Sequence, residues 1–209
     1  MKEGEKTARV LEVGPGLRLL GTINGLISER ELVRISFEEF SPTAVALHIS
    51  PEELEGLEAV MRKKVKKTPM SSYEMVYARK LSRFGEVQVP SPALVEAVEL
   101  ASDRGIPVEA LDMDDERFSS QYTELISGLT MIRSSLRLKS INRRKFHQDT
   151  PEKFIMEWDR MVNGSRGFRA LERMREEYMA GIIEKLSREH ERLLCILQLE
   201  RMKGIAGRL

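Results

Sequence analysis

The stretch LRLLGTINGLIS, residues 17–28, contains the point at which the sequence changes from a strand pattern to a helix pattern. Its apolar run reaches Gly21-Thr22, and a polar loop then leads to the helix-capping residue Ser28. A strand that ends in a short loop before a helix is the repeating unit of α/β proteins, and such loops often carry functional residues. This loop offers Asn24, which is a poor metal ligand and a poor general base. The stretch therefore indicates the fold class and leaves the chemistry open.

The segments on either side of this stretch continue the strand–helix alternation. Residues 9–22 alternate and break at Gly14-Pro15-Gly16, which indicates a β-hairpin. Amphipathic helical patterns follow, and β-prone runs lie between them at 44–50, 106–113 and 192–199. Because strands separated by helices pair in parallel, we predict an α/β fold. Its sheet should be mainly parallel, with an N-terminal β-hairpin and flanking helices.

Residues 116–165 interrupt this alternation because they carry helical patterns only. We interpret them as a helical insertion within a single domain that covers residues 1–209. The methionine and aromatic side chains of this region recur at helical spacing, which favours core packing. An insertion that has to bury an apolar face could also provide the surface of a homodimer.

The composition is typical of a soluble globular protein. Hydrophobic residues make up 41% of the chain and charged residues 32%, and the net charge is +1. Cys195 is the single cysteine, so an intramolecular disulfide is excluded. The sequence has neither a signal-peptide pattern nor an apolar run long enough to span a membrane. We therefore expect a cytoplasmic protein without a transmembrane segment.

Two basic clusters, at 62–67 and 133–145, could contact phosphates. Between Leu125 and Gln148 there are six basic residues and no acidic one. No nucleic-acid-binding motif accompanies either cluster, and aromatic residues are almost absent from both. Solvated helix faces are the simpler interpretation, so nucleic-acid binding is not expected. Whether the clusters bind anything else is left open.

Four pieces of the sequence, in order, resemble the motifs of the TraB/PrgY family. GLRLLGTINGLIS resembles its first motif, in which a strand runs into Gly-Thr and then a histidine, and SPTAVALHIS resembles its second strand, which ends in a glutamate. PALVEAVELASDRGIPVEALDMDDERF looks like its helix and a strand ending in Asp-Arg. REEYMAGIIEKLSREHERLLCILQLERMKGIAGRL looks like its last helix, final strand and closing Gly-x-x-His-x-x-Gly-Ile. The pieces cover roughly 9–60, 90–118 and 170–209.

The resemblance implies the α/β fold of a group thought to be metal-dependent hydrolases, but most chemical positions differ. Asn24 stands at the first histidine, His48 at the strand-end glutamate and Arg201 at the closing histidine. Asp112 and Arg175 match the family pattern. Methionine replaces two further charged positions, at Met113 and Met174. A catalytic metal site needs about three His or carboxylate ligands and an open position. We therefore expect a degenerate member with no catalytic residue, no metal and no cofactor.

Five positions form the candidate ligand-binding or anion-binding site: Asn24, His48, Asp112, Arg175 and Arg201. If the family fold is kept, they meet where strand ends and helix N-termini suit an anion, and arginine matches carboxylate or phosphate best. The alternative that we favour is structural. In it, the two arginines pair with Asp112 and a helix glutamate in an ion network.

Two functions follow from this pattern. The leading hypothesis is a non-enzymatic TraB-like protein with a binding or regulatory role and a peptide or protein partner. A peptide is implied only by the family's link to peptide signalling. The alternative is a hydrolase with a rebuilt site, which would act on an anionic substrate around His48, Asp112 and the two arginines.

Overall fold

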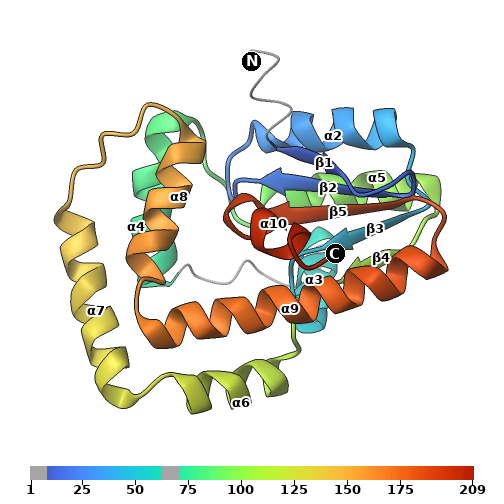
Figure 1. The fold of residues 1–209 in the computed structure, drawn as a ribbon. Coiled ribbons are helices and arrows are strands. Elements are labelled where there is room, and N and C mark those ends of the chain that lie inside the picture. Colours follow the sequence, from blue (N-terminus) through green and yellow to red (C-terminus); the bar gives the residue numbers. More distant parts are fainter. Residues whose placement is uncertain (1–8, 63–70) are drawn as a thin grey trace.

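The computed structural model describes residues 9–62 and 71–209 and has an α/β architecture (Figure 1). The elements in chain order are β1 (Val10–Glu12), β2 (Leu17–Thr22), α2 (Glu29–Phe40), β3 (Ala44–Leu47), α3 (Pro51–Met61), α4 (Ser72–Leu81), the 3₁₀ turn η1 (Ser82–Phe84), α5 (Pro92–Arg104), β4 (Val108–Ala110), α6 (Asp115–Leu125), α7 (Gly128–Arg143), α8 (Pro151–Val162), α9 (Arg166–Glu189), β5 (Leu193–Gln198) and α10 (Leu199–Ala206). Across the two described ranges, no helix combines the length and the apolar character needed to cross a membrane.

The five strands form one sheet in the order β1-β2-β5-β3-β4. β1 pairs antiparallel with β2, and the remaining neighbours pair in parallel. The predicted α/β fold and its N-terminal hairpin are therefore confirmed. The central strands are continuous apolar runs because helices cover both faces of the sheet.

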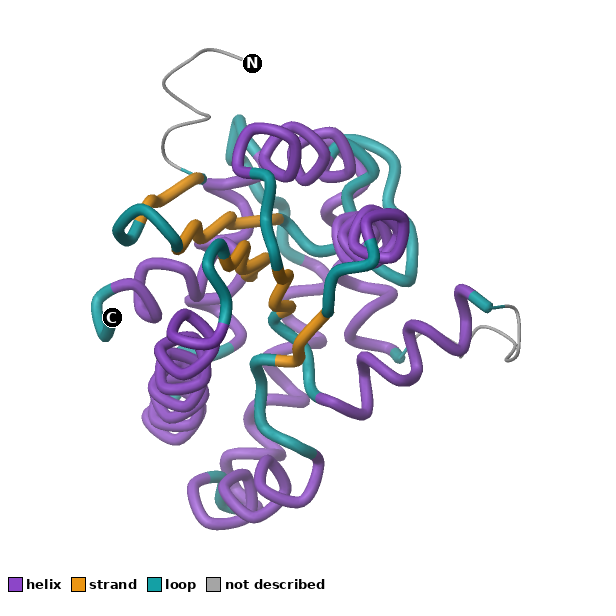
Figure 2. The backbone as a smooth tube through the Cα atoms, turned by 90° about the vertical axis from the view of Figure 1, so that its right-hand side faces the viewer, coloured by secondary structure: helices purple, strands orange, loops and turns teal. Residues whose placement is uncertain are grey.

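Helices lie on both sides of the sheet (Figure 2), and each face of the sheet carries its own core. On one face α2, α3 and α5 pack against the strands around Phe37, Val45 and Ile196. On the other, α9 and α10 pack around Met179 and Cys195. Cys195 is fully buried, which agrees with its expected role as a small apolar side chain.

A third core holds an arm of helices beyond one end of the sheet (Figure 1). Phe154 and Trp158 of α8 are its largest buried side chains, which confirms the core packing predicted for them, whereas Met156 of the same helix is 43% exposed, so the prediction was wrong for that residue. The Trp158 indole donates a hydrogen bond of 2.9 Å to the Tyr73 hydroxyl on α4. The predicted insertion region, 116–165, contains α6, α7 and α8, and α4 joins the last two in this core. No pattern in the sequence indicated that α4 takes part in this core.

Side chains cap the starts of α3 and α8, but the cap expected at the start of α2 is absent. Ser50 and Glu53 form a capping box at α3, and the Thr150 hydroxyl accepts a hydrogen bond from the Lys153 N–H at α8. Ser28, expected to cap α2, makes no side-chain cap. Glu29 instead accepts a 3.0 Å hydrogen bond from the Ile23 N–H.

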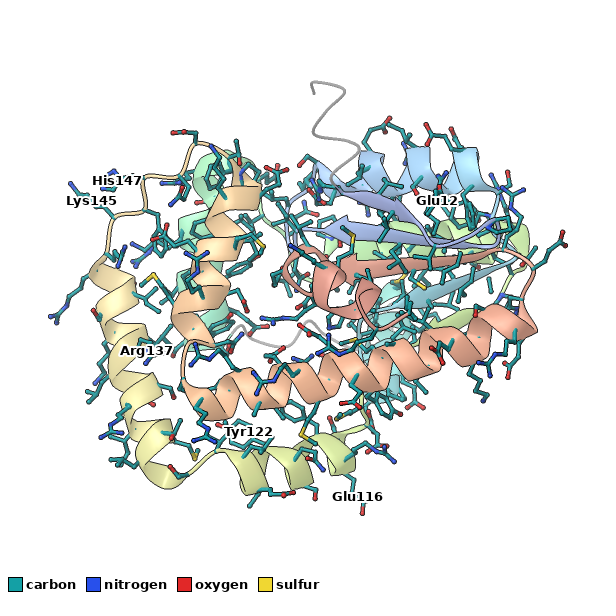
Figure 3. The ribbon with its side chains drawn as sticks, viewed as in Figure 1. Glu12, Glu116, Tyr122, Arg137, Lys145 and His147 are labelled. Carbon is teal, nitrogen blue, oxygen red and sulfur yellow. The ribbon has the colours of Figure 1, made fainter. Side chains whose placement is uncertain are left out.

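The basic cluster at 133–145 lies on α7 and in the loop after it, where Figure 3 labels Arg137 and Lys145. Arg62 directly follows α3, whereas residues 63–67 of the other cluster lie outside the described residues.

If the arm depends on the third core, truncating Phe154 should destabilise the protein far more than truncating its neighbour Met156, which is 43% exposed. Phe154→Ala should lower the free energy of unfolding by about 3–5 kcal/mol because it leaves a cavity. Met156→Ala should lower it by less than about 0.5 kcal/mol. Denaturant unfolding measures both. Equal small losses would contradict the packing of α8 described above.

Candidate functional site

A cavity of about 580 Å³ opens at the edge of the sheet where β2, β3 and β5 end. Asn24, His48 and Arg175 all line it. Its apolar lining comes mostly from α3, α5, β5 and the segments before α3 and α5: Ile49, Leu57, Val60, Val89, Leu94 and Ile196. Ligand sites of α/β proteins form at this edge because strand ends meet helix N-termini there. The structure thus brings three of the five candidate residues to one cavity.

The charged lining residues differ in depth. His48 lies at the bottom with only 3% of its surface exposed, and the Arg175 side chain is largely buried. Glu53 and Glu74 are exposed, so they stand at the rim. Each rim carboxylate also accepts a hydrogen bond from a backbone N–H at the start of its own helix. The cavity therefore has a cation and an imidazole at its base and carboxylates at its mouth.

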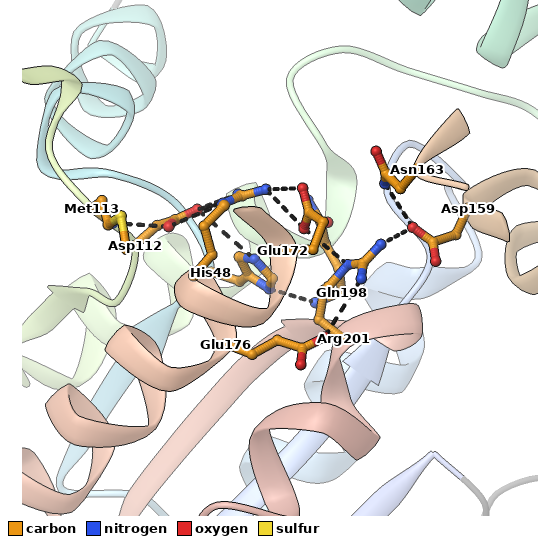
Figure 4. A network of polar contacts seen from close by, with 10 residues as sticks. His48, Asp112, Met113, Asp159, Asn163, Glu172, Glu176, Gln198 and Arg201 are labelled. Atoms are coloured by element: carbon orange, nitrogen blue, oxygen red, sulfur yellow. Dashed lines mark hydrogen bonds and ion pairs between the residues drawn. The ribbon is translucent and has the colours of Figure 1, made fainter. Parts of the chain in front are cut away.

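His48 follows β3 directly. A backbone contact determines its tautomer, and burial determines its charge. Its Nδ1 accepts a hydrogen bond of 3.2 Å from the Gln198 N–H (Figure 4). The neutral ring then carries its proton on Nε2, which lies 3.9 Å from the nearest Asp112 oxygen and has no hydrogen-bond partner among the described residues. Burial, reinforced by nearby Arg175, lowers the pKa of His48 to about 3. The imidazole is therefore neutral at physiological pH.

Asp112, two residues beyond β4, is held by Arg175 of α9. Arg175 Nε lies 3.3 and 3.1 Å from the two Asp112 oxygens, and Nη2 also contacts this carboxylate. Burial acts to raise the pKa of Asp112, but the guanidinium outweighs burial and the pKa is lowered. The Met113 N–H adds a hydrogen bond of 2.8 Å. This carboxylate is therefore ionised and engaged on both oxygens.

The same arginine begins a longer network (Figure 4). Arg175 Nη1 donates to Glu172 at 3.0 and 3.1 Å, and Glu172 also contacts Nε of Arg201 at 3.2 Å. Arg201 further contacts Asp159 of α8 and, at 3.5 Å, Glu176. The network therefore joins the end of β4 to α8, α9 and α10.

Close packing fixes the far end of this network. A Cβ atom at Gly204 would lie 2.3–2.6 Å from the Glu176 carboxylate, so a larger residue here would displace the Glu176 side chain. Glu176 also pairs with Arg208 at 3.1 Å. Gly204 of α10 therefore lies directly against the Glu176 side chain of α9.

Asn24 stands in a loop held by a second buried ion pair. Arg9 contacts the Glu29 carboxylate and donates a 3.0 Å hydrogen bond to the Gly21 carbonyl. Gly25 has a φ of 98°, a conformation that favours glycine. The Tyr77 hydroxyl donates to the Asn24 carbonyl at 3.0 Å. The Asn24 side chain is left exposed at the cavity.

The five candidate residues therefore divide into two groups. Asn24, His48 and Arg175 line the cavity, whereas Asp112 and Arg201 lie in the ion network. The favoured structural interpretation agrees with these contacts in part: Arg175 pairs with Asp112 and Glu172, whereas Arg201 pairs with Glu172, Glu176 and Asp159 and has no ion pair with Asp112 in the described part of the chain. The two methionines at family positions line a separate hollow beside α6 and α9: Met113 and Met174.

Several residues of this edge were not identified from the sequence. Glu172 was missed although it lies three positions before the predicted Arg175, and Glu176 was missed although it lies four positions after Glu172 on the same face of α9. That spacing was a usable signal, although it did not indicate the partners. Asp159 and Gln198 had no local signal, because their contacts join segments far apart in the chain.

Glu200, in the first turn of α10, was also missed. Burial raises the pKa of its carboxyl to about 7, and the charge of nearby Glu172 acts in the same direction. A carboxyl that titrates near neutrality is a candidate for acid–base work. Glu200 is not among the residues that line the cavity.

The chemistry available in the cavity is hydrogen bonding and charge recognition. Within the ranges 9–62 and 71–209, no three His, Cys, Asp or Glu side chains are grouped so that they could hold a metal ion. The His48 ring has no free lone pair, because Nδ1 is an acceptor and Nε2 carries the proton.

A comparison of the sequence with models of known protein families finds no match. A comparison with curated proteins finds none either.

Removing Asp112 from the network should be costly because it leaves Arg175 buried with an incomplete set of partners. Asp112→Asn should lower the free energy of unfolding by about 3 kcal/mol. The control is Glu58→Gln, which breaks an exposed pair with Arg62 and should cost less than about 0.5 kcal/mol. Denaturant unfolding at neutral pH compares the two, and equal costs would mean that the network is not structural.

Glu200 should make the protein less stable as the pH rises, whereas a carboxylate that is ionised and paired in the folded state has the opposite effect. Its folded pKa of about 7 lies above the ordinary value of 4.5, so the folded state holds a proton that the unfolded state releases. Stability is therefore lost as the pH rises from about 5 to 7. Glu200→Gln should stabilise the protein by about 2 kcal/mol at pH 8 and by almost nothing at pH 4.5.

The exposed Glu177→Gln is the matched control, and it should not change the pH profile. Denaturant unfolding across pH 4.5–8 measures both variants. A Glu200→Gln protein less stable than wild type at pH 8 would contradict the burial described above.

Proposed function

We propose that the chain is a non-enzymatic, TraB-like binding protein whose cavity takes the carboxylate end of a short apolar peptide. One observation carries this proposal. The N-cap residues of α5 and α10, Ser91 and Gln198, line the same cavity as Arg175, and neither makes a side-chain cap. Backbone N–H groups without side-chain caps at a helix start suit an anion, and a guanidinium is the best side-chain partner for a carboxylate.

The rest of the cavity supports a ligand with two charged ends. The exposed carboxylates Glu53 and Glu74 at the rim would attract an ammonium group. The apolar walls between rim and base would cover apolar side chains. A free peptide has this order of groups: ammonium, apolar body and carboxylate. A volume of about 580 Å³ is in the usual range for a small-ligand site.

The geometry favours binding over the rebuilt hydrolase site. A hydrolase at these residues would need a group that accepts a proton at neutral pH. The Nδ1 lone pair of His48 is taken by the Gln198 N–H, and both oxygens of Asp112 are bound by Arg175. Neither residue is free to act as the base, so recognition of an anionic group is the role that both hypotheses share.

The other partner expectations stay predictions. Self-association through the helical insertion would bury exposed apolar side chains of α7. A cytoplasmic location and a protein partner likewise rest on the sequence alone. None of these is needed for the cavity to bind a peptide.

Calorimetry with three forms of one tripeptide, Val-Ala-Leu, tests the proposal. The free tripeptide should bind, and its C-terminal amide should bind at least tenfold more weakly because it lacks the negative charge. The N-acetylated form should lie between the two. Absence of binding by the free form up to about 1 mM, or equal binding by free and amidated forms, would overturn the proposal.

A substitution in the cavity lining tests the same proposal from the protein side. Gln198→Glu adds a negative charge to the cavity lining at the start of α10, where the peptide carboxylate is proposed to lie, and should weaken binding of the free tripeptide at least fivefold. Asn142→Asp adds the same charge on α7, away from the cavity, and should leave binding unchanged. Both substitutions replace an amide with a carboxylate of nearly the same shape.

A further inference from the structure

Helix α7 carries an exposed apolar ridge on the outside of the arm. Leu129, Ile132 and Leu136 are 56%, 61% and 59% exposed, and their spacing places them on one face of the helix. Single exposed apolar residues are ordinary, but three on one line form a patch that needs an explanation. We refer to these three residues as the α7 ridge.

Basic residues surround the ridge without acidic neighbours in the sequence. Arg133 lies next to it, and Lys139 and Arg143 extend its line toward the end of the helix. Lys145 follows at the outer edge of the arm (Figure 3). No acidic residue occurs from Leu125 to Gln148. The outer face of α7 therefore combines apolar contact area with positive charge.

A hollow of about 290 Å³ lies beside the ridge, between α7 and the start of α9. Arg133, Arg137 and Arg166 line it together with hydroxyl groups, and its lining contains no acidic residue. Arg137 is held in place because its Nη1 donates to the Met161 carbonyl at 3.1 Å. The N-terminus of the 24-residue helix α9 faces the same space. Three guanidinium groups beside a helix N-terminus fit a phosphate.

We propose that the outer face of α7 docks on the surface of an anionic phospholipid membrane. The α7 ridge enters the boundary between headgroups and acyl chains, as the apolar side of an interfacial helix does. The hollow receives a lipid phosphate, and the surrounding Lys and Arg side chains interact with the negative surface potential of the bilayer. This docking is independent of the peptide cavity, which lies at the edge of the sheet.

Charge and apolarity together single out this occupant. A second copy of the chain packed face to face on the ridge would bring two acid-free basic surfaces together, which is unfavourable. A nucleic acid would complement the charge but would leave the ridge in water. An anionic bilayer would bury the α7 ridge and would also complement the positive charge around it.

Co-sedimentation of the full chain with vesicles tests the proposal at about 0.1 M salt. The chain should bind vesicles of phosphatidylcholine and phosphatidylserine mixed 7:3 (about 30% anionic lipid) and should not bind pure phosphatidylcholine. Ile132→Ser combined with Leu136→Ser should weaken binding at least tenfold. Arg133→Glu combined with Arg166→Glu should weaken it by a similar factor. All four positions are exposed, so folding should be unchanged, and denaturant unfolding checks this.

Two control variants match these changes. Met75→Ser removes an exposed apolar side chain from α4, and Lys185→Ser removes an exposed charge from α9. Both should bind vesicles as the wild type does. Failure to bind anionic vesicles, or binding that the ridge variants do not change, would overturn the proposal. So would a dimer in sedimentation velocity that Leu136→Ser dissociates, or binding to single-stranded RNA in preference to vesicles.

Discussion

The bidentate contact between Arg175 and Asp112 is the interaction on which the functional edge of this protein depends. It places a guanidinium between the end of β4 and helix α9, and it leads through Glu172 to Arg201 on α10. Buried charges are tolerated only when each has partners, so every member of this network constrains the others. The arm is tied into it as well, because Asp159 of α8 contacts Arg201.

This network determines the protonation states of Asp112 and His48. Asp112 is kept ionised by Arg175, and His48 is kept neutral by burial and by the same arginine. Two groups that could work as an acid and a base are thus fixed in one protonation state each. The cavity is also lined by the N-cap residues of α5 and α10 and by an apolar wall, whereas the Arg175 guanidinium is already engaged by Asp112 and Glu172. The outer face of α7 lies on the arm, so the two proposed binding surfaces are served by different elements.

The sequence predicted the elements that local patterns determine. The hairpin and the parallel strands agree with the structure, and so does the pairing of Arg175 with Asp112 and of both arginines with a helix glutamate. It did not predict α10, the joining of α4 to α8 or the absence of a Ser28 cap. The Tyr73–Trp158 and His48–Gln198 hydrogen bonds join residues 85 and 150 positions apart. No local pattern reports such pairs, because only the folded topology brings them together.

The protonation state of His48 is the most direct test of the ion network at this edge. It depends at once on Arg175, on burial and on the Gln198 N–H at the start of α10. Nitrogen NMR of the ¹⁵N-labelled imidazole, followed from pH 8 down to pH 4, distinguishes the tautomers and the charged ring. The His48 ring should stay neutral and protonated on Nε2 throughout this range, because its pKa is about 3. A ring that titrates near pH 6.5, or one protonated on Nδ1, would contradict this expectation.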